Sequence, residues 1–168
     1  MISPIESGII FGPYKKDDCY LIEKSKELSK LSGIKIAEFV LIKGDSLWVV
    51  EAKSSIPKPT NEKQYNDFFI EIHDKLLNTV TITFNAITKR NKNIYGELPV
   101  NVKGINIQNT DIYLRLVIPT VPKKFLPPMT DKMRKVMSIV MKTWGIKDFQ
   151  VQVLNEDMLI SQGLKNQE

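Results

Sequence analysis

Two strand-like runs joined by a two-residue turn constrain the fold of this 168-residue chain more than any other feature. The runs cover residues 34–43 and 46–54 and are rich in β-branched and aromatic side chains, which favour strands. Gly44 and Asp45 stand between them, and such a pair is a strong signal for a tight β-hairpin. The sequence therefore predicts an antiparallel hairpin with a fixed register.

That register places two glutamates opposite each other. If the two turn residues form the loop, counting outward pairs Val40 with Val49 and Glu38 with Glu51. Cross-strand neighbours have Cβ atoms about 4.5–5.5 Å apart, and like charges at that distance destabilise a sheet. Either one carboxyl group keeps its proton with a raised pKa, or a cation lies between the two. Mg²⁺ suits the second case, because it binds one or two carboxylates together with waters and phosphates.

Lys53 and Ala52 extend this group of residues. Lys53 follows Glu51 by two positions, so both side chains lie on the same face of the strand. The carbonyl oxygen of Ala52 offers a further metal ligand. We expect Glu38 and Glu51 to bind Mg²⁺ or Mn²⁺, and Lys53 to position a water or to stabilise developing charge. This chemistry suits the hydrolysis of phosphodiesters.

A plainer interpretation of the Glu-Ala-Lys triplet stays open. A triplet of this kind arises by chance about once in a chain that is this rich in lysine and glutamate. Glu51 and Lys53 would then form a solvated ion pair at the end of a strand, which contributes little to stability.

The segment EFVLIKGDSLWVVEAK, residues 38–53, resembles the motif of the PD-(D/E)XK nuclease superfamily, which includes restriction endonucleases and RecB-like nucleases. The resemblance implies an α/β fold of the restriction endonuclease type, in which helices flank a mixed β-sheet and stand before and after the hairpin. It places Glu51 and Lys53 at the (D/E)xK positions and Glu38 at the upstream acidic position. The family usually has aspartate there, so Glu38 is a longer ligand than usual.

Two accessory positions follow from the same resemblance. Many members of the superfamily carry a glutamate on the first helix, for which Glu23 and Glu27 are the candidates here. The RecB-like branch has a glutamine in the helix after the motif, and Gln64 stands in the corresponding region.

Helical and strand-like patterns alternate along the rest of the chain, which predicts one α/β domain over residues 1–168. The segment 79–84 also alternates like a strand, but we expect a helix, since three- and four-residue spacing continues across it. The predicted elements are a strand at 8–14, a helix at about 18–31 capped by Asp17, a helix from 60 or 61 to about 90, a loop at 91–110, a strand at 111–119, a helix at 131–144 capped by Thr130 and ended by Gly145, a strand at 147–154 and a short helix after it.

Composition excludes several classes of protein. The apolar fraction of 42% is typical of globular chains, and no run approaches the roughly 20 apolar residues of a membrane span. One cysteine and one histidine exclude a disulfide framework and metal sites built from several such residues. The N-terminus lacks the basic region of a signal peptide and carries an early Glu6, so we expect a cytoplasmic protein without a membrane partner.

A net charge of +5 is compatible with an acidic partner, and we expect nucleic acid, DNA in the first instance. The basic side chains Lys132, Arg134 and Lys135 lie on one predicted helix, and Lys89 and Arg90 end another. Each group is either a phosphate-binding surface or a solvated helix face. The chain has little room for a separate recognition domain, so a homodimer or a partner subunit is plausible. The functional prediction is a magnesium-dependent endo- or exonuclease; the alternative is an inactive nuclease-fold module for nucleic-acid or protein binding.

Overall fold

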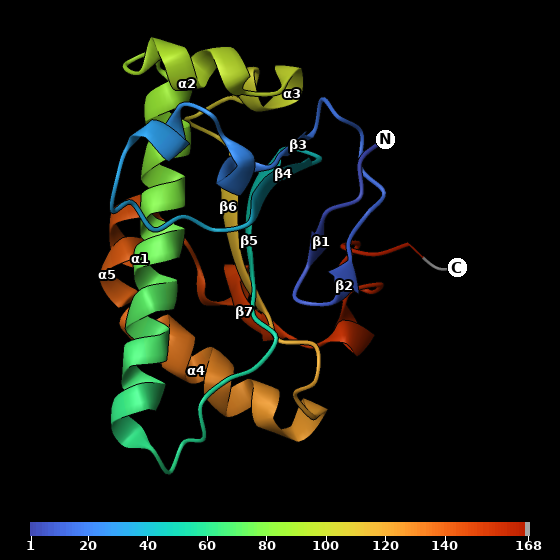
Figure 1. Ribbon diagram of the computed structural model, residues 1–168, viewed down its shortest axis with the longest axis vertical. Coiled ribbons are helices and arrows are strands. Elements are labelled where there is room, and N and C mark those ends of the chain that lie inside the picture. The colour runs from blue at the N-terminus through green and yellow to red at the C-terminus, as the bar shows by residue number, and fades with distance from the viewer. Residues whose placement is uncertain (167–168) are drawn as a thin grey trace.

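A five-stranded mixed sheet forms the centre of the computed structural model, which describes residues 1–166 (Figure 1). The strand order is β3-β4-β5-β6-β7, with antiparallel pairing from β3 to β5 and parallel pairing from β5 to β7. The strands are β3 (Cys19–Tyr20), β4 (Phe39–Lys43), β5 (Ser46–Ala52), β6 (Asp111–Val117) and β7 (Val151–Leu154).

The helices cover one face of this sheet (Figure 1). The long helix α1 leads from the end of β5 back to the region before β6, as a parallel strand pair requires. The predicted α/β class, a mixed sheet flanked by helices, is confirmed. The helices are α1 (Glu62–Ile87), α2 (Lys92–Glu97), α3 (Val100–Lys103), α4 (Leu126–Val136) and α5 (Ser138–Trp144), with short 3-10 turns at Ile22–Lys24, Leu28–Lys30, Lys123–Phe125, Asp148–Gln150 and Glu156–Met158.

The opposite face is covered by an N-terminal hairpin and by the segment after β7 (Figure 1). The hairpin consists of β1 (Ile5–Glu6) and β2 (Ile9–Ile10). Side chains of the central strands alternate between the two faces, so two apolar clusters form. Val40 and Val49 pack under the helices, whereas Phe39 and Val50 pack under the hairpin side.

The predicted hairpin register is confirmed from the pair Lys43–Ser46 to the pair Phe39–Val50, whereas the predicted pairing of Glu38 with Glu51 does not form. Lys43 pairs with Ser46, and Val40 pairs with Val49, as counting outward from the turn predicts. The ladder ends at the pair Phe39–Val50, and the amide of Glu38 then donates to the carbonyl oxygen of Val50 at 3.1 Å instead of pairing with Glu51. Glu38 therefore stands just before β4, on the same face of the sheet as Val40 and next to the α1 side.

The prediction of a strand at 34–43 is wrong for its first half. Residues 34–38 lie outside the strand, since β4 begins at Phe39. Glu38 is still bonded to Val50 of the sheet, but Lys35 and Ala37 are bonded to side chains of α1. The amide of Ala37 donates to Oγ1 of Thr79 at 2.8 Å, and Nδ2 of Asn78 donates to the carbonyl oxygen of Lys35 at 2.9 Å. Side chains of α1 thus satisfy backbone groups that a longer strand would have paired.

The helix predicted at 18–31 is also wrong. This segment contains the edge strand β3 and two 3-10 turns. The carboxylate of Glu97, at the end of α2, accepts hydrogen bonds from the amides of Lys26 (3.0 Å) and Glu27 (3.1 Å) and from the hydroxyls of Tyr20 and Ser25. A tertiary contact therefore overrides the local helical pattern.

The boundaries of several other elements differ from the predicted ones. Helix α4 begins at Leu126, before the predicted cap at Thr130, because Pro127 and Pro128 fit the first helical positions, where no amide donor is needed. The loop predicted at 91–110 contains α2 and α3. The strand predicted at 8–14 is reduced to β2, and the one predicted at 147–154 begins at Val151.

The long helix and its neighbours match the predictions more closely. Helix α1 is capped by Asn61, whose Oδ1 accepts from the amide of Gln64 at 3.3 Å. Gly145 ends α5 in the left-handed conformation, with φ of 66°. Within residues 1–166, no helix is long and apolar enough to cross a membrane.

The Glu97 anchor can be tested by substitution. Glu97→Ala leaves the amides of Lys26 and Glu27 without their acceptor, so we expect the free energy of unfolding to fall by about 2 kcal/mol, the range of hydrogen bonds to charged groups. Urea unfolding measures this change. Asp67→Ala, at an exposed position of α1, is the matched control and should change it by less than about 0.5 kcal/mol. Equal stabilities of the two variants would contradict the anchoring role.

Candidate active site

Glu51 is the centre of the candidate site. It lies near the end of β5 on the face that packs against α1, and its side chain is 0% exposed. Its Oε1 accepts a hydrogen bond from Nζ of Lys75 on α1 at 2.8 Å. Burial raises the pKa of Glu51, and the charges and hydrogen bonds of Lys75 and Lys53 oppose this shift. A lysine of the helix thus balances a carboxylate of the strand.

Lys53 lies between two carboxylates. Its Nζ donates to Oε1 of Glu71 on α1 at 2.8 Å and lies 3.5 Å from Oε1 of Glu51. Burial lowers the pKa of Lys53, but the hydrogen bond to Glu71 and the nearby negative charges outweigh burial, so the net shift is upward. Lys53 is therefore positively charged at neutral pH, and its side chain keeps 28% exposure.

Glu38 carries the strongest electrostatic perturbation of the site. It is 9% exposed. Burial raises the pKa of Glu38 to about 9, helped by a hydrogen bond with Glu23 and by the negative charges of Glu51 and Glu23. Lys75 opposes the shift only in part. A pKa of about 9 corresponds to a protonated carboxyl group at neutral pH, with burial as the main cause and the predicted repulsion by Glu51 as a smaller one.

The carbonyl oxygen of Ala52 points toward the Glu38 side of β5. The amide of Lys53 donates to the carbonyl oxygen of Val117 on β6 at 2.9 Å. In a trans peptide the N–H and C=O groups point in opposite directions, so the carbonyl of Ala52 in the same peptide points away from β6. The β4–β5 ladder of the described residues ends at the pair Phe39–Val50, before Ala52.

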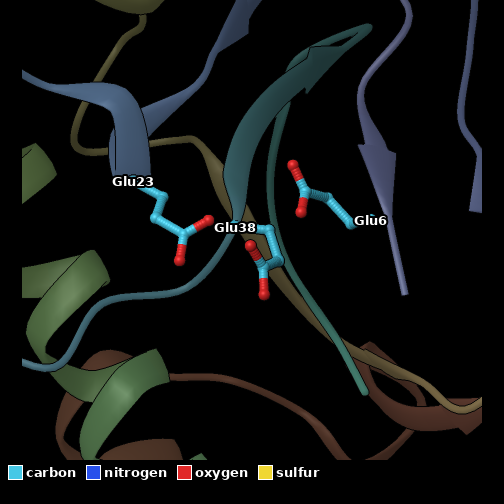
Figure 2. A group of neighbouring side chains, drawn as sticks. All are labelled: Glu6, Glu23 and Glu38. Atoms are coloured by element: carbon cyan, nitrogen blue, oxygen red, sulfur yellow. The ribbon is translucent and has the colours of Figure 1, made fainter. Parts of the chain in front are cut away.

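Two further glutamates face Glu38 at the open edge of the sheet. Glu23 comes from the 3-10 turn after β3, and Glu6 comes from β1 on the other side (Figure 2). Each of the three carboxyl groups contributes an oxygen atom, and these atoms all lie within 4.8 Å of one another. We call Glu6, Glu23 and Glu38 the glutamate triad.

Of the predicted accessory residues, only Glu23 lies at the site. The carboxylate of Glu27 is paired with Nζ of Lys30 at 2.7 Å. Gln64 is exposed in the first turn of α1, two turns before Glu71. Neither Glu27 nor Gln64 contacts the residues around Glu51, so both are set aside as site residues.

The predicted basic residues fall into two groups. Lys132 donates to Oδ1 of Asn66 at 2.6 Å, so it lies beside the half of α1 that carries Glu71. Arg134 donates to the carbonyl oxygen of Val151 at 3.1 Å, and Lys135 is exposed. Residues 89–90 follow the far end of α1, roughly 27 Å from Glu71 at 1.5 Å per residue. Lys89 lies over the ring of Tyr95 at 5.1 Å, and Arg90 is exposed.

Three residues of the site were missed by sequence reasoning. Lys75 and Glu71 both lie on α1, four residues apart, and therefore face the same side of the helix. That spacing of opposite charges, on the helix that follows the motif, was a usable signal. Glu6 carried no comparable signal, since its place depends on the path of the N-terminal hairpin.

Two oxygen atoms of this site lack a partner that a divalent cation could supply. Oε2 of Glu38 and Oε2 of Glu51 are both buried and have no hydrogen-bond partner. A buried polar atom without a partner costs free energy, and a bound cation would remove that cost. The donors are carboxylates and one carbonyl, which suit Mg²⁺ and Mn²⁺ better than softer metals. A cavity of about 310 Å³ is lined in part by Glu23 and Lys75, whose charges act on Glu38, but neither Glu38 nor Glu51 lines it.

Comparisons with models of protein families, with curated proteins and with solved structures found no match to this chain. The geometry of the site is therefore the basis of the functional proposal.

The pKa of Glu38 predicts a pH dependence of stability in metal-free protein. An ordinary glutamate has a pKa of 4.5, and the folded-state value is about 9, so unfolding releases a proton between these values. Stability should therefore fall as pH rises from about 5 to about 9, by at most about 1.4 kcal/mol per pH unit from this group. Glu38→Gln should flatten the curve, as thermal unfolding in EDTA at several pH values can show.

Glu27→Gln is the control for this measurement, because Glu27 lies away from the site. It should keep the slope of the unaltered protein. Parallel curves for the unaltered protein and Glu38→Gln would show that Glu38 is ionised in the folded chain.

Proposed function

We propose that this chain is a metal-dependent nuclease of the PD-(D/E)XK type, which hydrolyses phosphodiester bonds of nucleic acid, with DNA as the expected substrate. The supporting observation is the pair of buried, unpartnered carboxylate oxygens on Glu38 and Glu51, next to the charged Lys53. The order of sheet, hairpin and following helix agrees with the restriction endonuclease-like fold that the motif implies, although two short 3-10 turns replace the helix before the hairpin.

Glu38, Glu51 and the carbonyl oxygen of Ala52 would hold Mg²⁺ or Mn²⁺. When bound, such an ion polarises a phosphoryl oxygen and lowers the pKa of water. Lys53 has an exposed side and a donor that reaches Glu51, so it can orient the attacking water or bind a phosphoryl oxygen. Glu71 keeps Lys53 charged and limits its rotation.

The basic side chains near this end of α1 suit the approach of a phosphate backbone. Lys132 lies beside Asn66, close to the helix half that carries Glu71, and Lys135 is exposed on the same helix as Lys132. Lys89 and Arg90 lie at the far end and would contact only a long substrate. A homodimer or a partner subunit would extend this surface, since one domain of this size offers little separate recognition area.

One observation favours the alternative of an inactive nuclease-fold module for nucleic-acid or protein binding. Lys75 and Lys53 both lie within 3.5 Å of Oε1 of Glu51, so this carboxylate is neutralised without a metal. A buried carboxylate that is paired with lysines can serve the fold alone.

Cleavage assays separate the two functions. We expect the purified protein to cut plasmid or single-stranded DNA with Mg²⁺ or Mn²⁺, and EDTA to stop the reaction. Lys53→Ala should lower the rate by about 10²- to 10³-fold, the loss seen when one donor to developing charge is removed. Lys63→Ala, on an exposed part of α1, is the matched control and should keep most of the activity.

Absence of cleavage of any DNA or RNA with either metal, together with retained nucleic-acid binding, would contradict the nuclease and favour the binding module. Equal rates for Lys53→Ala and Lys63→Ala would remove Lys53 from the mechanism.

A further inference from the structure

The N-terminal hairpin has an inverted pattern of side chains. Glu6 pairs with Ile9, and Ile5 pairs with Ile10. Paired residues share a face, so Glu6 turns toward the sheet with the buried Ile9, while Ile5 and Ile10 are 65% and 57% exposed. Burial of Ile9 and Phe11 on this face holds the hairpin in this orientation, so Glu6 is carried inward beside them.

The turn of this hairpin fixes Glu6 in place. Ser7 and Gly8 both have positive φ angles, 52° and 81°, as the two-residue turns that match strand twist require. A shift of register by one residue would move Glu6 to the outer face. Ile9 and Phe11 are buried against the sheet and anchor the hairpin there.

Held in this way, Glu6 meets Glu23 and Glu38 from the opposite side of the sheet edge (Figure 2). The short strand β3 leaves the start of β4 uncovered, so the three carboxyl groups gather at an open edge. Among residues 1–166, no ion pair includes a member of this glutamate triad. Glu38 is also nine-tenths buried, with Oε2 unpartnered.

We propose that the glutamate triad is a divalent-cation site of its own, whose ion fastens the N-terminal hairpin to the open edge of the sheet. Oxygen atoms on opposite sides of Ca²⁺ lie about 4.6–5.2 Å apart, and those around Mg²⁺ about 4.0–4.2 Å apart, at twice the ligand distances. The triad oxygens lie within 4.8 Å of one another, a limit that falls inside the Ca²⁺ range and above the Mg²⁺ range. The triad site shares Glu38 with the proposed nuclease centre. It depends on the proposed function only through this shared residue.

Manganese binding tests the site directly, with Mn²⁺ as the probe. Calorimetry and electron paramagnetic resonance would compare the unaltered protein with Glu6→Gln, Glu51→Gln and the control Glu62→Gln, an exposed position of α1. We expect Glu6→Gln to weaken one Mn²⁺-binding event at least tenfold, whereas Glu51→Gln and Glu62→Gln leave that event unchanged.

Hydrogen exchange reports on the hairpin independently of activity. Mn²⁺ should slow exchange of the amides of residues 5–10 in the unaltered protein and have no such effect in Glu6→Gln. The melting temperature of Glu6→Gln in EDTA shows whether it folds, and we expect it to equal or exceed that of the unaltered protein, since one of three facing carboxylates is neutralised.

The outcomes separate this site from the nuclease. If Glu6→Gln binds Mn²⁺ as the unaltered protein does and gains the same protection, the triad site is overturned while the proposed nuclease stands. If Glu6→Gln loses a binding event but the unaltered protein cleaves no nucleic acid, the triad site is supported and the nuclease is contradicted.

Discussion

The buried ion pair between Glu51 and Lys75 is the interaction on which the arrangement of the site depends. A fully buried carboxylate without a cation would cost several kcal/mol, so β5 can carry Glu51 only where α1 brings Lys75 within 2.8 Å. The same requirement fixes the rotation of α1, because Glu71 lies one turn earlier on that face and binds Lys53. Strand and helix are thereby held in one register around the end of the hairpin.

Glu38 is also a buried acidic residue, but no lysine balances it as Lys75 balances Glu51. Burial raises its pKa to about 9, Glu23 and Glu51 add to the shift, and Lys75 offsets it only in part. Such a group is costly in a fold that has no use for it. In the proposed function, a divalent cation would replace the proton of Glu38 and allow both carboxylates to ionise.

Local patterns predicted the hairpin well because its register depends on few residues. A two-residue turn and strict alternation place Glu38, Glu51 and Lys53 on one face, and the pairing of Lys43 with Ser46 agrees. Long-range contacts could not be predicted in this way. Glu97 binds the amides of Lys26 and Glu27 from 70 residues away and replaces a helix that the local pattern favoured.

The residues of the site also divide into those that the local sequence places together and those that only long-range contacts bring there. Glu51 and Lys53 belong to one strand, so the sequence places them together. Lys75 comes from a helix and Glu6 from a hairpin on the other face, and only the folded chain brings these to the carboxylates. Glu27 was a candidate because many members of the superfamily carry a glutamate on the first helix. The segment forms a 3-10 turn instead of that helix, and Glu27 pairs with Lys30 away from the site.

A crystal grown with Mn²⁺ tests the central claim most directly, since anomalous scattering locates the ion without regard to activity. We expect an anomalous peak within about 2.0–2.3 Å of carboxylate oxygens of Glu38 and Glu51, at a distance typical of hard divalent cations bound to oxygen. A crystal that shows Mn²⁺ only at other surfaces, with Lys75 and Lys53 still paired to Glu51, would contradict the claim that these carboxylates bind metal.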